Sequence, residues 1–534
     1  MIINGKKCIF VDYQNDTTYM TTEVKEYILS NYKQASSVSE LSRNIIDKFK
    51  ITFKREDSVR RWVSSFLARE LHNNVTPTTD KTTDIKPLQL NESKYYILTW
   101  EQNNSKLHKQ LWENILAYKE FLNAELAVIL GVYHKPDPRN GSVYYNKETN
   151  PYWDFTRHDI HKYVNILSDV NVSPTAEYPL RGLEGISRDK TSIIGHPKRH
   201  FQCLPTLEGT PHKALFTTMS ITLPNYIHSK LGKKAEFVHK NGFVIVEIRN
   251  EDVFHIRQVE AEINGSFIDL IHEVSNGEVK INDYAAAIVW GDIHVGSTDT
   301  HVKMETDRLV NRLNIPISIF HDLADGESVN NHIVNDPIQQ IKRLDKFQDD
   351  VFEEINQITK FIKEVPTSQN IIVNSNHDNR FDRWIKDIDW KKDIKNARAY
   401  LWLADIALNA QNDKGILANI LDNNPDINTK VTTLGLNDSY RIGGFELGMH
   451  GHIGQGGTRG SLTQFAKLNT PTITGHSHSP GVINDSYSVG TSTYLRLGYN
   501  VGASNWAQAH CLLHKNNTVQ HIMFTRGHYT TFDI

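Results

Sequence analysis

Short apolar runs that end in Asp, Asn or His dominate the hydrophobic pattern of the last third of the chain. The first run covers residues 287–290, and Asp292 and His294 follow it two residues apart. Side chains at positions i and i+2 of a strand point the same way, so these two can hold one cation from one side. Four similar runs follow in order, at residues 315–322, 370–378, 445–452 and 471–478. Because open α/β folds build ligand sites at the carboxyl ends of strands, the pattern predicts a metal site.

The middle of the chain alternates strand and helix patterns. Residues 95–100 predict a strand, residues 107–122 a helix, and residues 126–131 a second strand. A βαβ unit implies a parallel sheet with a right-handed crossover. Further β-prone runs lie at residues 193–194, 214–222 and 237–248. We therefore expect an accessory α/β domain over residues 93–283.

The N-terminal part has the periodicity of helices. Apolar positions recur at helix spacing between residues 20 and 70, with a break at residues 49–55. Three short helices predict a helix-turn-helix-like domain over residues 1–72. Residues 73–92 lack aromatic residues and periodicity, which is typical of a linker.

The clearest helical pattern in the chain spans residues 337–365. Its apolar side chains form one stripe, and Asp and Lys fill the opposite face. A stripe of this kind indicates packing against a core, so it carries no chemistry. Residues 284–534, which hold all five strand-end runs, form the expected C-terminal domain.

Composition adds three points to this picture. A chain of 534 residues with 39% hydrophobic and 23% charged residues is typical of a globular protein of several domains. It has no run of 18 apolar residues and no signal-peptide pattern, so we expect no contact with a membrane. Its three cysteines are scattered, which favours a reducing cytoplasm.

Local charge, in contrast to the net charge of −3, points to polyanion binding. Residues 33–69 carry nine Lys and Arg against four Asp and Glu, and residues 188–240 carry nine against three. We expect Arg60, Arg61, Lys198 and Arg199 to contact DNA phosphates. The alternative is an ordinary solvated basic face in both places.

The five runs together resemble the calcineurin-like metallophosphoesterases, whose blocks read D-x-H, G-D-x-x-D, G-N-H-[DE], H and G-H-x-H. The resemblance covers roughly residues 285 to 525 and implies a four-layer αββα sandwich. Two positions depart from it: His321 and Ser375 stand where the family has Gly, which leaves the geometry of two loops open.

The resemblance also implies roles for particular residues. Two divalent metal ions would be held, one by Asp292, His294 and His478 and the other by Asn376, His450 and His476, with Asp322 bridging them. His450 is favoured over His452 because it directly follows an apolar run. His377 would act as general acid or position the phosphate, oriented by Asp378. Mn fits this mixture of oxygen and imidazole donors best, with Fe, Zn and Mg as alternatives.

Basic residues near these blocks suggest the substrate. Arg380 and Arg383 follow the third block, and Arg459 lies in a glycine-rich segment between the last two, so we expect all three to bind phosphate. The catalytic core resembles SbcD-type nucleases, and the layout resembles pre-early DNA-transfer proteins of phages, which are linked to destruction of host DNA. If a phage encodes the protein, this resemblance implies the cytoplasm of the host cell as its location.

The resulting hypothesis is a metal-dependent DNA nuclease that uses a hydroxide between the two metals for in-line attack on phosphorus. A phosphatase or phosphodiesterase that acts on a nucleotide or phosphoprotein is the first alternative. A DNA-binding regulator with a relic site is the second. We expect DNA as a partner, self-association into a homo-oligomer, and possible contact with a second phage or host protein.

Overall fold

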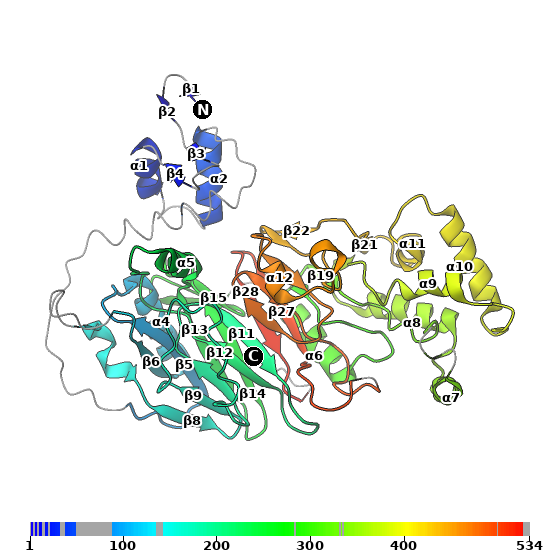
Figure 1. Cartoon of the computed structure of the whole chain (residues 1–534), viewed down its shortest axis with the longest axis horizontal. Coiled ribbons are helices and arrows are strands. Elements are labelled where there is room, and N and C mark those ends of the chain that lie inside the picture. The colour runs from blue at the N-terminus through cyan, green and yellow to red at the C-terminus, as the bar shows by residue number, and fades with distance from the viewer. Residues whose placement is uncertain are drawn as a thin grey trace.

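The computed structural model describes residues 88–526 except 135–142, 282–284, 331–332, 334–335 and 499. Before residue 88 it describes residues 2–3, 6–7, 10–12, 17–19, 22–31, 38–49 and 63. The predicted α/β class is confirmed, since helices alternate with several sheets (Figure 1). None of the helices within these residues combines the length and the hydropathy needed to cross a membrane.

A six-stranded sheet carries the first three strand-end runs. Its spatial order is β21 (Val431–Thr433), β20 (Gln369–Ile372), β19 (Ile317–Phe320), β18 (Ala285–Val289), β27 (Ala509–His514) and β28 (Val519–Met523). Strands β18, β19 and β20 pair in parallel, so their carboxyl ends meet at one edge.

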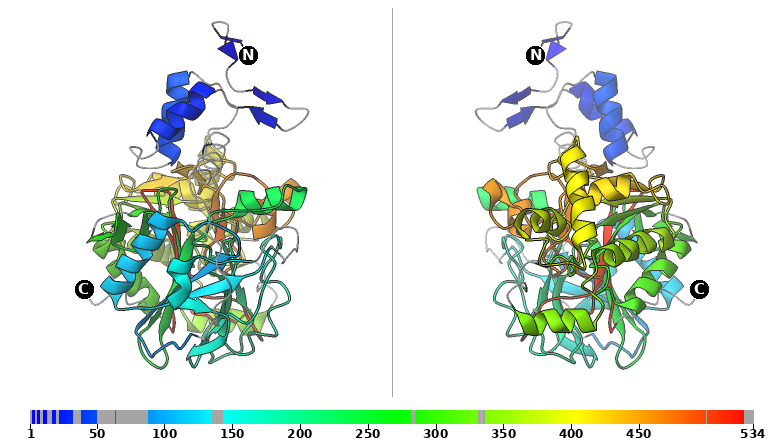
Figure 2. Two further views of the ribbon diagram at one scale, coloured as in Figure 1. Left: turned by 90° about the vertical axis from the view of Figure 1, so that its left-hand side faces the viewer. Right: turned by 90° about the vertical axis from the view of Figure 1, so that its right-hand side faces the viewer.

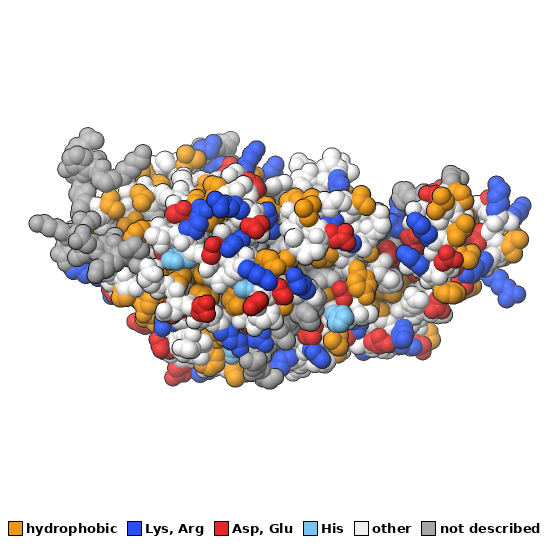
Figure 3. Space-filling model, turned by 90° about the horizontal axis from the view of Figure 1, so that it is seen from below, with side chains coloured by type: hydrophobic (Ala, Val, Ile, Leu, Met, Phe, Trp, Pro, Cys, Tyr) orange, Lys and Arg blue, Asp and Glu red, His pale blue; other side chains and the backbone are white. Residues whose placement is uncertain are grey.

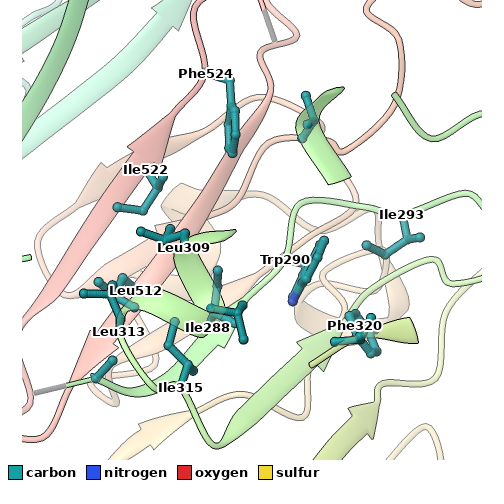
Figure 4. Packing of buried hydrophobic residues seen from close by; sticks show 14 of the residues in the cluster. Ile288, Trp290, Ile293, Leu309, Leu313, Ile315, Phe320, Leu512, Ile522 and Phe524 are labelled. Carbon is teal, nitrogen blue, oxygen red and sulfur yellow. The ribbon is translucent and has the colours of Figure 1, made fainter. Parts of the chain in front are cut away.

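Helices α6 (Thr300–Arg312) and α8 (Val351–Glu364) pack on one face of this sheet. Leu309 of α6 belongs to the same buried cluster as Ile288 of β18 and Leu512 of β27 (Figure 4). Phe361 of α8 contacts Phe320 of β19, with ring centroids 5.7 Å apart. Burial of these apolar side chains supplies the main stabilising term of such a layer.

A ten-stranded sheet carries the last two runs. Its spatial order is β22 (Arg441–Ile442), β23 (Phe445–Glu446), β24 (Thr472–Thr474), β26 (Ser486–Ser488), β25 (Gly481–Ile483), β11 (His200–Leu204), β12 (Lys213–Thr217), β10 (Thr191–Ile194), β9 (Val164–Leu167) and β8 (Arg157–His161). Ile319 and Ile371 of the six-stranded sheet share a buried cluster with Ile473, Val482 and Tyr487 of this one. The two sheets therefore enclose a common core.

This sheet also crosses the boundary expected between residues 283 and 284. Strand β11 pairs antiparallel with β25, and His200 lies opposite Ile483. Half of the sheet thus comes from the accessory segment and half from the C-terminal segment, because backbone pairing joins strands far apart in sequence.

A five-stranded sheet completes the accessory region, in the order β14 (Phe254–Glu260), β13 (Gly242–Ile248), β5 (Tyr95–Gln102), β6 (Glu125–Gly131) and β7 (Trp153–Asp154). Strands β5 and β6 are parallel and joined through α4 (Lys109–Leu122), as the sequence predicts. A three-stranded sheet of β15 (Phe267–Asp269), β16 (His272–Ser275) and β17 (Glu278–Ile281) follows.

The remaining helices correct one prediction. Residues 337–365 form two helices, α7 (Pro337–Asp345) and α8, and not one. Phe347 takes a left-handed backbone with φ of 56°, and the Asp350 side chain caps α8 by accepting from the Glu353 N–H. Ile341 of α7 is 61% exposed, so the apolar stripe does not stay buried through the break.

Further helices are α5 (Lys230–Val238), α9 (Arg380–Asp387), α10 (Ala397–Asn409), α11 (Ile416–Asp422) and α12 (Leu462–Phe465), with 3-10 turns η1 (Lys147–Tyr152) and η3 (Gln455–Gly457). Helices α9, α10 and α11 contact one another and lie together at one end of the molecule (Figures 1 and 2).

In the N-terminal part, α1 (Thr22–Asn31) and α2 (Val38–Phe49) agree with the helical periodicity. Short strand pairs precede them: β1 (Ile2–Ile3) with β2 (Lys6–Lys7), and β3 (Phe10–Asp12) with β4 (Thr17–Tyr19). The third expected helix lies outside the described residues apart from Val63, as does most of the expected linker.

Candidate metal centre

The predicted site residues come from the ends of five strands. Asp292 and His294 follow β18, Asp322 follows β19, and Asn376 follows β20; His450 follows β23, and His476 and His478 follow β24. Because β23 and β24 also run parallel, the ends of both sheets converge on one place. All seven residues predicted as ligands are brought together there.

The first group consists of Asp292, His294, Asp322 and His478, whose ligand atoms all lie within 4.8 Å of one another. The Nε2 atom of His478 is 3.0 Å from Oδ2 of Asp292 and 3.1 Å from Nε2 of His294. Oδ1 of Asp292 is buried and accepts no hydrogen bond from the described residues. A buried carboxylate oxygen without a donor, beside two imidazole nitrogens that face each other, suits a cation.

The second group consists of Asp322, His450 and His476. The Nε2 atom of His450 lies 3.2 Å from Oδ2 of Asp322 and 3.1 Å from Oδ1 of Asn376. Asp322 therefore belongs to both groups, and Asn376 offers its oxygen to the second. His452 is not part of either group, so the geometry favours His450.

The backbone at these residues is unusual. His294, Asp322, His476 and His478 all have a positive φ, between 42° and 71°. Residues other than Gly seldom adopt this conformation, and such strain gathers at functional sites. Gly475 allows the close approach, since a Cβ there would lie 2.2 Å from Oδ1 of Asp292.

The two positions that depart from the metallophosphoesterase pattern need no glycine here. Neither His321 nor Ser375 has a positive φ. The Ser375 hydroxyl accepts the backbone N–H of Asp378, which supports the turn. His321 is fully buried, and burial lowers the pKa of its ring to about 3.

Charges in the site favour a bound cation. Burial opposes ionisation of Asp322, but the neighbouring His450 and His377 rings outweigh it and hold the pKa of Asp322 well below its usual value. Burial likewise opposes a charge on His294, but Asp325 and Asp322 raise its pKa to about 9. Asp322 thus stays ionised, and its negative charge attracts either protons on the neighbouring imidazoles or a divalent cation. The donor set fits a metal ion.

Contrary to the prediction, Asp378 does not contact the ring of His377 and does not orient it. Oδ1 of Asp378 accepts the Ala324 N–H at 2.8 Å, so this carboxylate fixes the loop after β19. The Nδ1 atom of His377 instead lies 2.8 Å from the backbone carbonyl of Asp325. Asp325 was not assigned a role from the sequence, although it is the second Asp of the G-D-x-x-D block; its carboxylate also lies 3.5 Å from Nδ1 of His294.

Three predicted phosphate ligands lie beside the cluster. Arg380 donates to the Asp325 carbonyl at 2.8 Å, with its other nitrogen 3.3 Å from Nε2 of His377. Arg383 donates to the carbonyl of Asn376 at 2.7 Å. Arg459 is exposed, and its charge helps to lower the pKa of His476, which burial brings to about 4. Three positive charges therefore lie near residues of the cluster.

Two residues predicted to contact DNA do not lie on the surface. Arg199 is 1% exposed and binds Glu260 and the hydroxyl of Tyr487 at 3.2 and 3.0 Å. Lys198 is 5% exposed and donates to the carbonyl of Glu177. They lie directly before β11, and their bonds are to residues within the protein, so both predicted DNA contacts are corrected to structural ones. Arg60 and Arg61 lie outside the described residues.

Fold and site together define a mixed α/β protein with a buried His and Asp cluster that can hold a metal ion. The chain is 30% identical to protein A1 of Escherichia phage T5 over 475 residues, which cover 83% of this chain and 84% of protein A1. It therefore belongs to the family of that protein and is related to a phage protein, as the resemblance suggested. No family model matches the chain. No solved structure matches it either.

Proposed function

We propose that this protein is a metallophosphoesterase that uses two metal ions, Mn best matching the donors, to cut DNA. The observation that carries the proposal is the pair of ligand groups that share Asp322. The ligands follow parallel strands of two sheets that pack on each other. The four-layer sandwich of the calcineurin-like metallophosphoesterases implies the same placement. When bound, such ions activate water and stabilise charge on the phosphoryl oxygens.

The protein's own residues would hold the substrate around the ions. Arg380, which contacts both His377 and the loop of Asp325, supplies a fixed positive charge for a phosphate oxygen. In this arrangement His377 positions the substrate phosphate next to the ligand cluster. Arg383 and Arg459 add positive charge near the cluster for further phosphates. The intact ligand set argues against a relic site in a DNA-binding regulator.

A small phosphoester is the second candidate substrate. The burial of Lys198 and Arg199 removes the two DNA contacts expected from the segment of residues 188–240. Basic and acidic side chains are also interspersed on the face of the molecule in Figure 3, without a single basic track. Dependence on polymer length separates the two candidates.

The test is to incubate the purified protein with linear and circular double-stranded DNA and Mn²⁺. EDTA and the variants Asp292→Asn and His377→Ala serve as controls. We expect metal-dependent loss of DNA that both variants abolish; loss of linear DNA alone indicates an exonuclease, and loss of both forms an endonuclease. If DNA stays intact while bis-p-nitrophenyl phosphate is hydrolysed, the enzyme acts on a small phosphoester. Inactivity on both substrates contradicts the proposal.

A further inference from the structure

A loop beside the metal centre runs from residue 494 to residue 506, of which the structure describes all but residue 499, and it has an aromatic residue at each end. At one end, the half-buried Trp506 ring lies against His478, with centroids 4.0 Å apart and planes at 65°. At the other end, Tyr494 is 48% exposed, and its N–H donates to the carbonyl of Ser297 at 3.2 Å. The hydroxyl of Ser297 in turn donates to Asp325 at 2.5 Å. The Trp506 ring thus contacts a site residue directly, whereas the backbone of Tyr494 is linked to the site through Ser297.

The loop that carries these rings is held in place by its own polar contacts. The guanidinium of Arg496 donates to the carbonyls of Asn500, Gly502 and Thr206, at 3.1, 2.5 and 3.3 Å. Thr206 and Ser504 exchange two backbone hydrogen bonds, at 2.8 and 3.0 Å. A ligand that binds to a loop fixed in this way loses little free energy in ordering it.

The backbone at Trp506 is tied to the metal centre. The backbone N–H of Trp506 donates to the hydroxyl of Ser504 at 3.2 Å, and the next residue, Ala507, donates its backbone N–H to the carbonyl of His478 at 3.1 Å. These bonds hold the Trp506 backbone beside a metal-ligand candidate, and the indole itself lies against the His478 ring. A partly exposed aromatic ring beside a site for phosphodiesters matches a nucleobase, which offers an aromatic face close to its phosphate.

We propose that Trp506 stacks on an unpaired nucleobase beside the scissile phosphodiester, so that the substrate is single-stranded DNA or the frayed end of a duplex. A base inside a duplex has both faces covered by its neighbours and cannot reach the indole. Tyr494, at the other end of the loop, is placed to contact a neighbouring nucleotide. This inference rests on the proposed function, since it names the substrate of the same site.

Binding of oligonucleotides tests the inference separately from cleavage. Fluorescence anisotropy in EDTA would compare a labelled single-stranded 12-mer with the same 12-mer made of abasic residues and with a blunt duplex. For the full-length protein we expect the 12-mer with bases to bind on the order of 10- to 100-fold more tightly than the abasic one. Trp506→Ala should lose most of that preference, and Trp506→Phe should keep part of it.

Trp402→Ala is the matched control, because Trp402 is a partly exposed tryptophan (37%) on α10. It should keep the full preference for bases. Equal binding of both 12-mers by the unaltered protein, or binding of the duplex as tight as that of the single strand, would overturn the inference. So would a preference that survives in Trp506→Ala.

Two further measurements distinguish base stacking from support of the metal ligand and from catalysis. If Trp506 only supports His478, Trp506→Ala should lose bound Mn²⁺, measured by mass spectrometry, and should bind both 12-mers more weakly by the same factor; that result contradicts stacking. If the preference for bases is present but Mn²⁺ produces no cleavage of any DNA, the proposed nuclease activity fails and the base contact stands.

Discussion

His377 shows how a single backbone contact changes the interpretation of a motif. Its Nδ1 atom meets the carbonyl of Asp325, while the carboxylate of Asp378, the residue next to it, faces away toward the Ala324 N–H. The orientation of His377 therefore depends on the loop after β19 and not on its sequence neighbour.

This arrangement predicts different effects for two neighbouring substitutions. His377→Ala should lower turnover of bis-p-nitrophenyl phosphate with Mn²⁺ by about 100-fold or more, because the proposed function assigns contact with the phosphate to His377. Asp378→Asn should lower it by less than about 10-fold, since the amide oxygen can still accept the Ala324 N–H. Steady-state rates and Mn content of both variants provide the measurement. Equal losses at unchanged metal content would restore Asp378 as the orienting group.

For single residues, the sequence predicts which side chains are metal-ligand candidates better than it predicts their hydrogen-bond partners and their burial. Asp292 and His294 lie together as predicted, but they follow β18 and His294 has a left-handed backbone, so the loop after the strand pairs them. The role of Asp325 could not be predicted in the same way, since it depends on a carbonyl direction set by the loop. The burial of Arg199 also escaped prediction, because sequence gives a charge but not the strand that covers it.

Among the elements, strand β5 ends in a buried acid that links stability to pH. Glu101 is fully buried and accepts the backbone N–H of Asn146 at 2.6 Å and the hydroxyl of Thr149 at 2.5 Å. Burial raises the pKa of Glu101 to about 7 from 4.5. Between those values the folded protein binds more protons than the unfolded chain, so stability falls as pH rises from 4.5 to 7.

Glu101→Gln should remove this dependence, because its amide stays neutral. The unaltered protein should lose up to about 3 kcal/mol of unfolding free energy between pH 5 and pH 8 through this group, and the variant should lose correspondingly less. Thermal unfolding at the two pH values is the measurement. Glu120→Gln, which changes an exposed acid on α4, is the control. A pH dependence identical in all three proteins would show that Glu101 does not contribute.

The elements themselves were predicted well where local periodicity decides them. Strands β5 and β6 and helix α4 lie where the pattern placed them. The break between α7 and α8 was missed, because the apolar spacing continues through Phe347, whose left-handed backbone ends the first helix.

Over the whole molecule, pairing between distant strands decides the architecture. Residues 200 and 483 lie opposite each other, so the ten-stranded sheet unites two segments that the sequence pattern divides. Local periodicity contains no information about such a pair. A division of the chain into independent domains at residue 283 would therefore cut through a sheet, whereas homo-oligomerisation and DNA binding stay predictions for experiment.

The expected N-terminal DNA contacts make a prediction for the intact protein. If Arg60 and Arg61 each neutralise one phosphate, Arg60→Ala/Arg61→Ala should reduce the slope of log affinity against log salt by about 1.8 for duplex DNA. The reason is that each contact releases condensed counterions, about 0.9 per phosphate. Titrations between low and moderate salt would give the slope.

A control pair makes this result interpretable. Lys360→Ala/Lys363→Ala removes two exposed charges from α8 and changes the net charge by the same amount. If contact with phosphate matters, only the arginine pair should flatten the slope, and hydrolysis of bis-p-nitrophenyl phosphate should stay unchanged in both. Equal slopes for the two variants would mean that general charge attracts the DNA. An unaltered slope in the arginine variant would leave the basic N-terminal segment without a role in DNA binding and favour a small phosphoester as the substrate.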